Sequence, residues 1–152
     1  MRCALLVILL VGSVAHASTP KEIDDAAAKA HNGLRTVVTK LAGKKLEGRD
    51  NATPGSLAAQ KYLIRKLRRL GVGLSGGGTE DAAYQQPFTH EGQTGTNLLA
   101  VMPGKDLADE YVMIGGHYDH LDSRSNASGA CAAGATPRGE ICNGAADNAS
   151  GV

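Results

Sequence analysis

A continuous apolar run, Tyr111 to Ile114, lies between charged residues and the pair Gly115-Gly116. A short run of this kind is typical of a strand that is buried on both faces of a sheet. Helix-patterned and strand-patterned segments precede it, which indicates an α/β layer architecture. Because such sheets bind ligands at the carboxyl ends of their strands, the residues after Ile114 are candidates for a functional site.

Two earlier segments carry apolar residues at the three- and four-residue spacing of amphipathic helices. The first is Lys21 to Leu41, and Gly43 is placed to end it. In the second, Thr53 can cap the helix, Pro54 suits its first turn, and Gly71 can end it. The predicted inward-facing residues are Ile23, Ala27, Ala30, Leu34, Val37, Val38 and Leu41 in the first helix, and Leu57, Leu63, Ile64, Leu67 and Leu70 in the second.

Two strands are predicted between the second helix and the apolar run. They are Tyr84 to Phe88 and Asn97 to Met102, joined through the turn-forming stretch Glu91 to Gly95. Gly76 to Gly78 has no phosphate-binding pattern around it, so we interpret it as a connecting loop. Asp122 to Asn143 is rich in Ser, Ala, Gly and Asn without periodicity, and we expect a surface loop there.

The N-terminus is patterned as a secretory signal peptide over residues 1–17. Arg2 gives a positive start, Cys3 to Val14 form an apolar stretch, and Ala15-His16-Ala17 offers small residues at a cleavage site. The apolar stretch is shorter than the roughly 20 residues that a spanning helix needs. We therefore expect a secreted or periplasmic protein whose mature chain, residues 18–152, has no membrane segment.

Charge and cysteine content narrow the functions open to the mature chain. Loss of Arg2 reduces the 16 basic residues to 15, which balance the 15 acidic residues. A charge near zero argues against a nucleic-acid or anionic-membrane partner. Cys131 and Cys142 form an even pair in an oxidising compartment, so we expect a disulfide. With four Tyr, one Phe and no Trp, the core is expected to be thin.

The candidate site residues are His117, Asp119 and Asp147, in the contexts GGHYDHLD and NGAADNASG. Residues two apart on an extended chain point to the same side, so His117 and Asp119 can meet. A zinc-binding imidazole normally donates its other N–H to a carboxylate, and Asp119 is placed for that role. Asp147 follows a glycine-containing turn, and its two oxygens could bridge two cations. A lone H-x-D is common by chance, and His120 is interpreted as structural or cleft-lining.

In combination, these motifs resemble those of the co-catalytic zinc aminopeptidases of peptidase family M28. The resemblance covers Asn97 to Val152 through GTNLLAVMPG, DEYVMIGGHYDHLD and NGAADNASGV. The upstream text LEGRDNATPGSLAAQKYLIRKLRRLGV is similar to the helix of the same family and its lead-in. The resemblance implies a single zinc-peptidase catalytic domain with a three-layer α/β sandwich and a mixed central sheet, of which residues 18–152 are the N-terminal part.

The resemblance also assigns roles to these residues. It implies two zinc ions, with His117 binding one of them, Asp147 bridging both, and Asp119 orienting His117. It further implies a cis peptide bond after Asp147 and hydrolysis of the N-terminal peptide bond of a peptide or protein substrate. In that family a Glu-Glu pair after the bridging aspartate supplies the general base and a ligand, and a later acidic residue and a histidine complete the set. This sequence contains no such pair after Asp147, so we expect weak zinc binding and little hydrolysis from these 152 residues.

Two alternatives remain at this point. The metal residues alone do not decide which end of a substrate is bound, so a carboxypeptidase or dipeptidase on the same scaffold is possible. The missing base also leaves a non-catalytic binding module of the same fold. Sequons at Asn51, Asn126 and Asn148 matter only in a eukaryotic secretory route, and Asn148 lies too near the proposed metals for a glycan to be expected.

Overall fold

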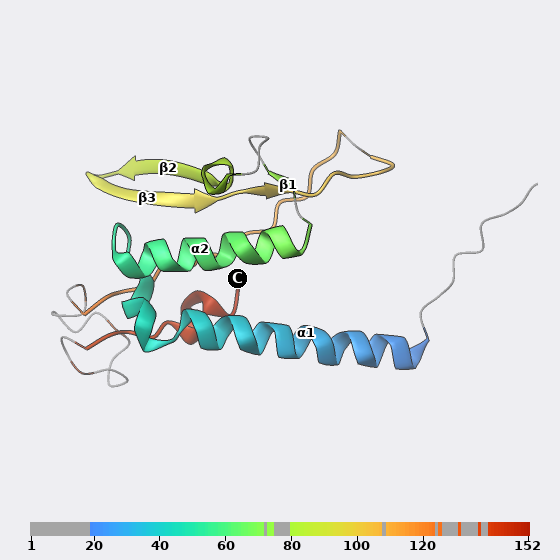
Figure 1. Cartoon of the computed structure of the whole chain (residues 1–152), viewed down its shortest axis with the longest axis horizontal. Helices are drawn as coiled ribbons and strands as arrows, with labels where there is room; N and C mark the ends of the chain where they lie inside the picture. The colour runs from blue at the N-terminus through green and yellow to red at the C-terminus, as the bar shows by residue number, and fades with distance from the viewer. Residues whose placement is uncertain are drawn as a thin grey trace, which may run out of the picture. The chain divides into compact units, whose positions relative to one another are not determined.

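The computed structural model describes residues 19–71, 73–74, 80–107, 109–123, 125, 131, 137 and 140–152. The expected signal peptide, the Gly76 to Gly78 loop, and much of the Asp122 to Asn143 loop lie outside the described residues. The elements are α1 (Pro20–Leu41), η1 (Lys44–Arg49), α2 (Pro54–Arg69), β1 (Gly73–Leu74), η2 (Asp81–Tyr84), β2 (Gln85–His90), β3 (Gln93–Leu98), β4 (Ala100–Val101) and η4 (Ala145–Ala149) (Figure 1).

The chain divides into two units, Met1–Asn32 and Gly33–Val152, and each is described by itself. In the first, Thr19 caps α1: its backbone N–H and hydroxyl donate to Glu22 Oε2 at 2.7 and 2.9 Å, and the Glu22 N–H donates to the Thr19 hydroxyl. The backbone hydrogen bond from Thr19, followed by that from its side chain, lowers the pKa of Glu22. The predicted apolar stripe is wrong in this unit, because Ile23 is 56% exposed and Ala27 and Ala30 are exposed.

The second unit contains the core, which is as thin as the composition indicates. Leu34 is exposed, but Val37 packs against the core and Leu41 is fully buried. The buried cluster draws on the end of α1, on η1, on α2 and on η4; its members are Leu41, Leu46, Ala59, Leu63 and Ala149. Among the described residues, no helix is both long and apolar enough to cross a bilayer.

Helix α2 begins and ends where the sequence predicts. The Thr53 hydroxyl accepts a hydrogen bond from the Ser56 N–H at 3.1 Å, Pro54 occupies the first turn, and Gly71 follows the helix with φ +69°. The predicted inward stripe is only partly right. Leu63 and Ile64 are buried, whereas Leu57 and Leu70 are 55% and 72% exposed.

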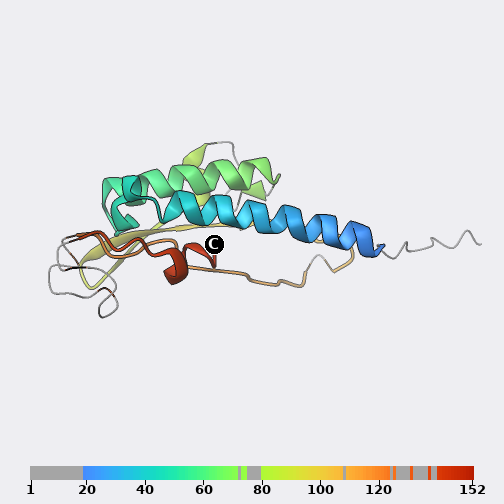
Figure 2. The same cartoon turned by 90° about the horizontal axis from the view of Figure 1, so that it is seen from below.

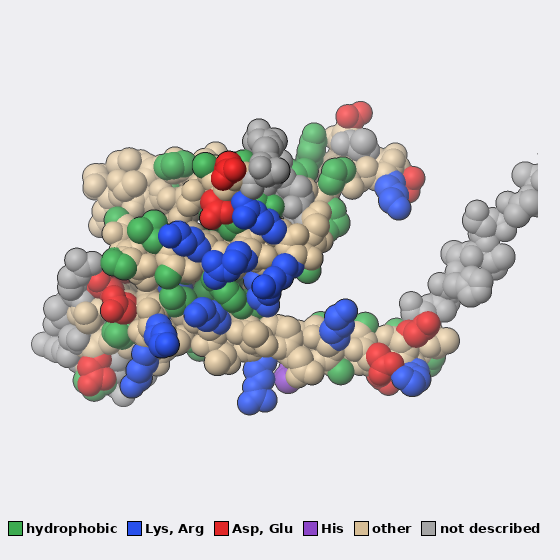
Figure 3. Space-filling view, in the orientation of Figure 1, with side chains coloured by type: hydrophobic (Ala, Val, Ile, Leu, Met, Phe, Trp, Pro, Cys, Tyr) green, Lys and Arg blue, Asp and Glu red, His purple; other side chains and the backbone are tan. Residues whose placement is uncertain are grey.

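Polar residues account for this difference on α2. Ser56 and Gln60 are buried on the inner face, and the Gln60 Oε1 accepts a hydrogen bond from Gln85 Nε2 at 2.8 Å. Since apolar periodicity does not register buried polar residues, it did not identify Ser56 and Gln60 as part of the inner face. The outer side carries the basic residues, which gather over α2 in Figure 3 and include Lys66, Arg68 and Arg69 of its last turn.

The predicted strand pair forms the hairpin β2–β3, with Gln85 opposite Leu98 and His90 opposite Gln93. The turn is shorter than predicted, because Glu91 and Gly92 alone connect the strands, with φ +48° and +78°. Two successive residues with positive φ match the right-handed twist of a tight hairpin. The second predicted strand is interrupted at Leu99, after which β4 pairs antiparallel with β1.

The buried strand predicted at Tyr111 to Ile114 is not formed. These four residues have no regular secondary structure, and their exposed fractions are 86%, 91%, 97% and 94%. A fully buried strand needs a partner on each edge and a layer on each face, and the described residues supply none of these at 111–114. The described part of the chain is therefore a mixture of helices with two two-stranded antiparallel sheets, which is compatible with an α/β fold, and a mixed central sheet is not among its elements.

Candidate active site

His117 lies on the extended segment that follows Ile114, and it contacts Asp119 as predicted from their spacing. Its Nδ1 is 3.2 Å from Asp119 Oδ1 and 3.1 Å from the Asp119 backbone oxygen. Both of these oxygens accept, so the arrangement favours the tautomer that carries the proton on Nδ1. The other ring nitrogen, Nε2, is left for a second partner.

Asp147 meets that second nitrogen. Its Oδ1 lies 2.9 Å from His117 Nε2, and the peptide bond between Asp147 and Asn148 is cis, as the family resemblance implies. Asp147 belongs to η4, which follows Gly144 in the left-handed conformation, and Ala149 at the end of η4 is fully buried in the core. The buried Ala149 therefore fixes the turn that carries an exposed carboxylate.

The structure thus brings all three candidate residues together. The side chains of His117, Asp119 and Asp147 are 53%, 37% and 70% exposed, so the group is open to solvent and to a ligand. His120 lies beside it with a side chain only 16% exposed, and its Nδ1 is 3.8 Å from Asp147 Oδ2. This position agrees with the interpretation of His120 as a residue that lines the site.

Close backbone packing places the two loops. Gly116 precedes His117, and a Cβ atom built on it would lie 2.5 Å from the backbone oxygen of Gly151. Gly144 has φ +58°, and a Cβ there would lie 2.6 Å from Arg49 Nη2 and 2.7 Å from the Asp147 backbone oxygen. Larger residues at either position would push the His117 and Asp147 segments apart.

Arg49 is a site-building residue that the sequence reasoning missed. Its side chain is fully buried, and its guanidinium donates to four backbone oxygens. Nε donates to Tyr118 at 2.6 Å and Nη2 to Gly144 at 3.1 Å, while Nη1 donates to Leu41 at 2.5 Å and Asn143 at 3.0 Å. Burial lowers the pKa of Arg49, and the nearby Asp119 carboxylate acts in the opposite direction.

Asn51 was assigned only to a sequon, yet its side chain reaches the site. Its Nδ2 donates to Asp119 Oδ2 at 2.9 Å, so Asp119 is held on one oxygen by Asn51 while the other faces His117. The sequence G-R-D-N contributed to the family resemblance, and this was the available signal for Arg49 and Asn51. The spacing of the motif does not predict which distant oxygens these two side chains bind.

Tyr118 connects this region to the hairpin. Its hydroxyl donates to the Thr96 backbone oxygen at 2.6 Å, across to β3. Burial raises the pKa of Tyr118, opposed by hydrogen bonds with Ser56 and Gln60 of α2. The residue between His117 and Asp119 is therefore anchored to both neighbouring elements.

The donor types and distances fit zinc. Two ligand atoms on one tetrahedral zinc lie roughly 3.3 Å apart, given zinc–ligand distances of about 2.0 to 2.1 Å. The 2.9 Å between His117 Nε2 and Asp147 Oδ1 is close to that separation. An imidazole with a carboxylate behind it is also the usual arrangement of a zinc-binding histidine. His117 and Asp147 would supply two ligands to such an ion, and a catalytic zinc normally takes three from the protein.

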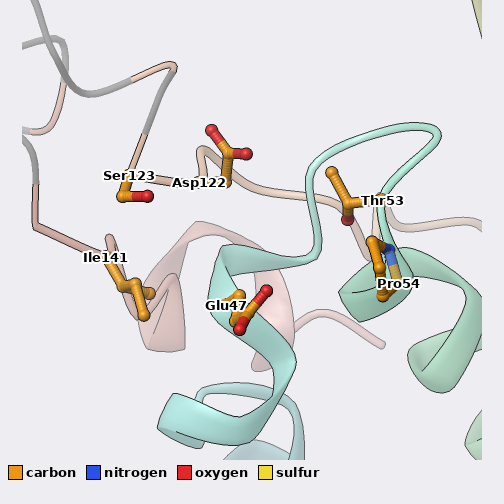
Figure 4. A pocket seen from close by; sticks show the side chains of 6 residues that line it. All are labelled: Glu47, Thr53, Pro54, Asp122, Ser123 and Ile141. Carbon is orange, nitrogen blue, oxygen red and sulfur yellow. The ribbon is translucent and has the colours of Figure 1, made fainter.

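A second group of possible ligands among the described residues is His120, Cys131 and Cys142. The two cysteines are joined by the predicted disulfide, with Cα atoms 6.1 Å apart. A disulfide offers no thiolate, so this group does not form a metal centre. A pocket of about 260 Å³ lies near the start of α2, and its lining includes Glu47, Thr53 and Asp122 (Figure 4). It does not include His117 or Asp147.

Comparison with known proteins relates the segment that carries these residues to a family of peptidases. Residues 97–152 match the model of peptidase family M28, a segment that contains all three candidate residues. The leupeptin-inactivating enzyme 1 of Streptomyces exfoliatus is 34% identical over 125 residues, which cover 79% of this chain and 25% of that enzyme. This chain thus spans about a quarter of that relative. No solved structure matches the chain.

These matches define the class as a family of peptidases. Residues 97–152 of the chain belong to peptidase family M28.

Proposed function

We propose that this chain is part of an exported, zinc-dependent aminopeptidase. In this proposal residues 1–17 direct export, and residues 18–152 form the N-terminal part of a single catalytic domain with the three-layer sandwich that the family resemblance implies. The substrate is a peptide or protein. The observation that supports the proposal best is the contact of His117 Nε2 with Asp147 Oδ1, with Asp119 on the other ring nitrogen.

The residues act as follows in the proposed reaction. Asp119 keeps the proton of His117 on Nδ1, so that Nε2 offers its lone pair to a cation. Asp147 offers both carboxylate oxygens, one on the side of His117 and one on the side of His120. When bound, divalent zinc acts as a Lewis acid toward the scissile carbonyl. The open position of these side chains leaves room for a substrate above them.

A carboxypeptidase or dipeptidase on the same scaffold, or a non-catalytic module, would use the same ligands. Reading the gene onward from the codon for Val152 separates enzyme from module. A Glu-Glu pair, then an Asp or Glu and a His, supports the enzyme, and their absence supports the module. For the enzyme, hydrolysis of peptides with a free amino terminus but not of N-acetylated peptides supports the aminopeptidase; the reverse preference would contradict it.

A further inference from the structure

Arg49, the last residue of η1, and Asn51, in the turn before α2, bind residues that adjoin the candidate metal ligands. Neither side chain reaches the Nε2 of His117 or the carboxylate of Asp147. Arg49 binds backbone oxygens, and Asn51 binds Asp119. We propose that these two residues are positioning residues for the metal site: Arg49 sets the distance between the two ligand-bearing loops, and Asn51 sets the direction in which Asp119 faces. This inference rests on the proposed function.

The case for Arg49 is its set of partners. It binds the Tyr118 oxygen in the first loop, directly beside His117, and the Asn143 and Gly144 oxygens in the second, shortly before Asp147. One planar guanidinium with fixed N–H directions therefore spans both loops, and it is fully buried. Its fourth hydrogen bond, to the Leu41 backbone oxygen, ties it to the end of α1, where Leu41 belongs to the core.

The case for Asn51 is geometric as well. A carboxylate that serves an imidazole must be held in place, since otherwise it can rotate away from the ring. Asn51 Nδ2 binds Asp119 Oδ2 at 2.9 Å, which leaves Oδ1 directed to His117 Nδ1 at 3.2 Å. The Asn51 backbone N–H donates to Asp50 Oδ1 at 2.7 Å, and the Asp50 side chain in turn accepts from the Ser125 hydroxyl. Asn51 is therefore itself fixed by the turn.

Arg49 and Asn51 are held together by one local structure. Arg49 has φ +66°, and Thr53 caps α2 while its hydroxyl donates to the Asp50 backbone oxygen at 2.5 Å. The start of α2 thus fixes the turn, and the turn fixes the site. A chain of contacts runs from the helix through Asn51 and Asp119 to His117, and a second runs from the core through Arg49 to both loops.

The test uses Co²⁺ as the probe, with the whole chain, because its visible absorption reports both affinity and ligand geometry. Loss of a carboxylate behind a zinc-binding histidine typically costs about 10- to 100-fold in metal affinity. We expect Asp119→Ala to fall in this range. Asn51→Ala, one contact further away, should lower affinity by about 3- to 10-fold and alter the Co²⁺ absorption spectrum. Asn97→Ala, in the exposed hairpin, is the matched control and should change neither.

A double-mutant cycle distinguishes positioning from a general structural role. If Asn51 acts through Asp119, Asn51→Ala should have no further effect in an Asp119→Ala background. An equal loss in both backgrounds would overturn the role of Asn51, as would unchanged Co²⁺ affinity in the folded single variant. For Arg49, Arg49→Lys keeps the charge but not the planar fork. It should weaken Co²⁺ binding at least as much as Asn51→Ala, and Arg65→Lys on the exposed side of α2 is its control.

A second readout separates failure of this inference from failure of the proposed function. The ¹⁵N shift of His117 Nδ1 reports its hydrogen bond with Asp119, with no cation added. We expect this hydrogen bond, 3.2 Å long in the parent chain, to weaken in Asn51→Ala. If the parent binds no Co²⁺ but shows this change, the proposed function fails and the positioning role stands. If the Nδ1 shift does not respond to Asn51→Ala, the positioning role fails whatever binds at Nε2.

Discussion

His117 and Asp147 meet through Nε2 and Oδ1, 2.9 Å apart, although they belong to different loops of the chain. Each is held from behind by a different means. Asp119 supports the imidazole, and the buried Ala149 fixes the turn of the carboxylate. Their convergence is the geometric condition for a shared cation, and it leads to the first prediction.

Substitution of either residue should abolish measurable Zn²⁺ binding by this chain. His117→Ala removes the imidazole nitrogen, and Asp147→Asn removes the carboxylate charge while keeping the shape. Isothermal titration calorimetry of the metal-free chain measures the result. His90→Ala is the control, because His90 is a highly exposed residue of the hairpin. Zn²⁺ binding that survives both substitutions would place the cation elsewhere.

Gly144→Ala should destabilise the chain more than a left-handed backbone alone explains. Forcing a non-glycine residue into this conformation costs about 1 to 2 kcal/mol. The added Cβ would also meet Arg49 Nη2 and the Asp147 backbone oxygen, so we expect a further loss of about 1 to 3 kcal/mol. Urea denaturation followed by circular dichroism gives the free energy of unfolding.

Gly71→Ala is the matched control for that measurement. Gly71 also has a positive φ, +69°, but nothing lies within 4 Å of a Cβ built there. It should carry the backbone cost alone. Equal losses in the two variants would show that Gly144 does not need its close approach to Arg49.

Met113→Lys should raise the soluble fraction of this chain. Met113 belongs to the run Tyr111 to Ile114, whose four residues are almost fully exposed. An exposed apolar segment of this kind is prone to intermolecular pairing. Size-exclusion chromatography over a concentration series should show less self-association in the variant. Leu57→Lys, at an exposed apolar residue of α2, is the control, because it tests whether any added charge reduces self-association equally.

Opening the disulfide should destabilise the unit Gly33–Val152. Cys131 and Cys142 are 11 positions apart, and closing a loop of that length restricts the unfolded chain by about 3 kcal/mol. Because Asn143 and Gly144 follow directly and bind Arg49, the Cys131→Ser/Cys142→Ser variant should also bind Co²⁺ more weakly. Thermal unfolding with and without dithiothreitol measures the first effect. A parent chain whose Tm is the same with and without dithiothreitol would contradict the predicted destabilisation.

Local signals predicted the fold where the structure depends on neighbouring residues. The ends of α2 were predicted correctly from Thr53, Pro54 and Gly71, because helix capping and a left-handed residue act within one turn of the helix. The hairpin was recognised for the same reason, although its turn proved shorter. The continuous apolar run Tyr111 to Ile114 predicts a buried strand, but burial requires partner strands that a local pattern does not contain, and these residues are exposed.

The candidate site divides in the same way. His117 and Asp119 were paired because their spacing on an extended chain is a local property. Asp147 was added by its motif and by resemblance to the family. Arg49 and Asn51 were missed because their partners are backbone oxygens and a carboxylate far along the chain. No spacing rule connects such partners before the fold is known.

The contact between Asn51 and Asp119 has a consequence for the choice of expression host. Asn51-Ala52-Thr53 is an acceptor sequence for N-linked sugars. In the folded chain its amide is engaged with Asp119, and its threonine is buried as the cap of α2. An oligosaccharide attached at Asn51 during synthesis in a eukaryotic cell would replace one of the two hydrogens on the nitrogen that donates to Asp119. Material made in yeast or insect cells would then differ from bacterial material at an asparagine whose side chain makes a native contact with the candidate site.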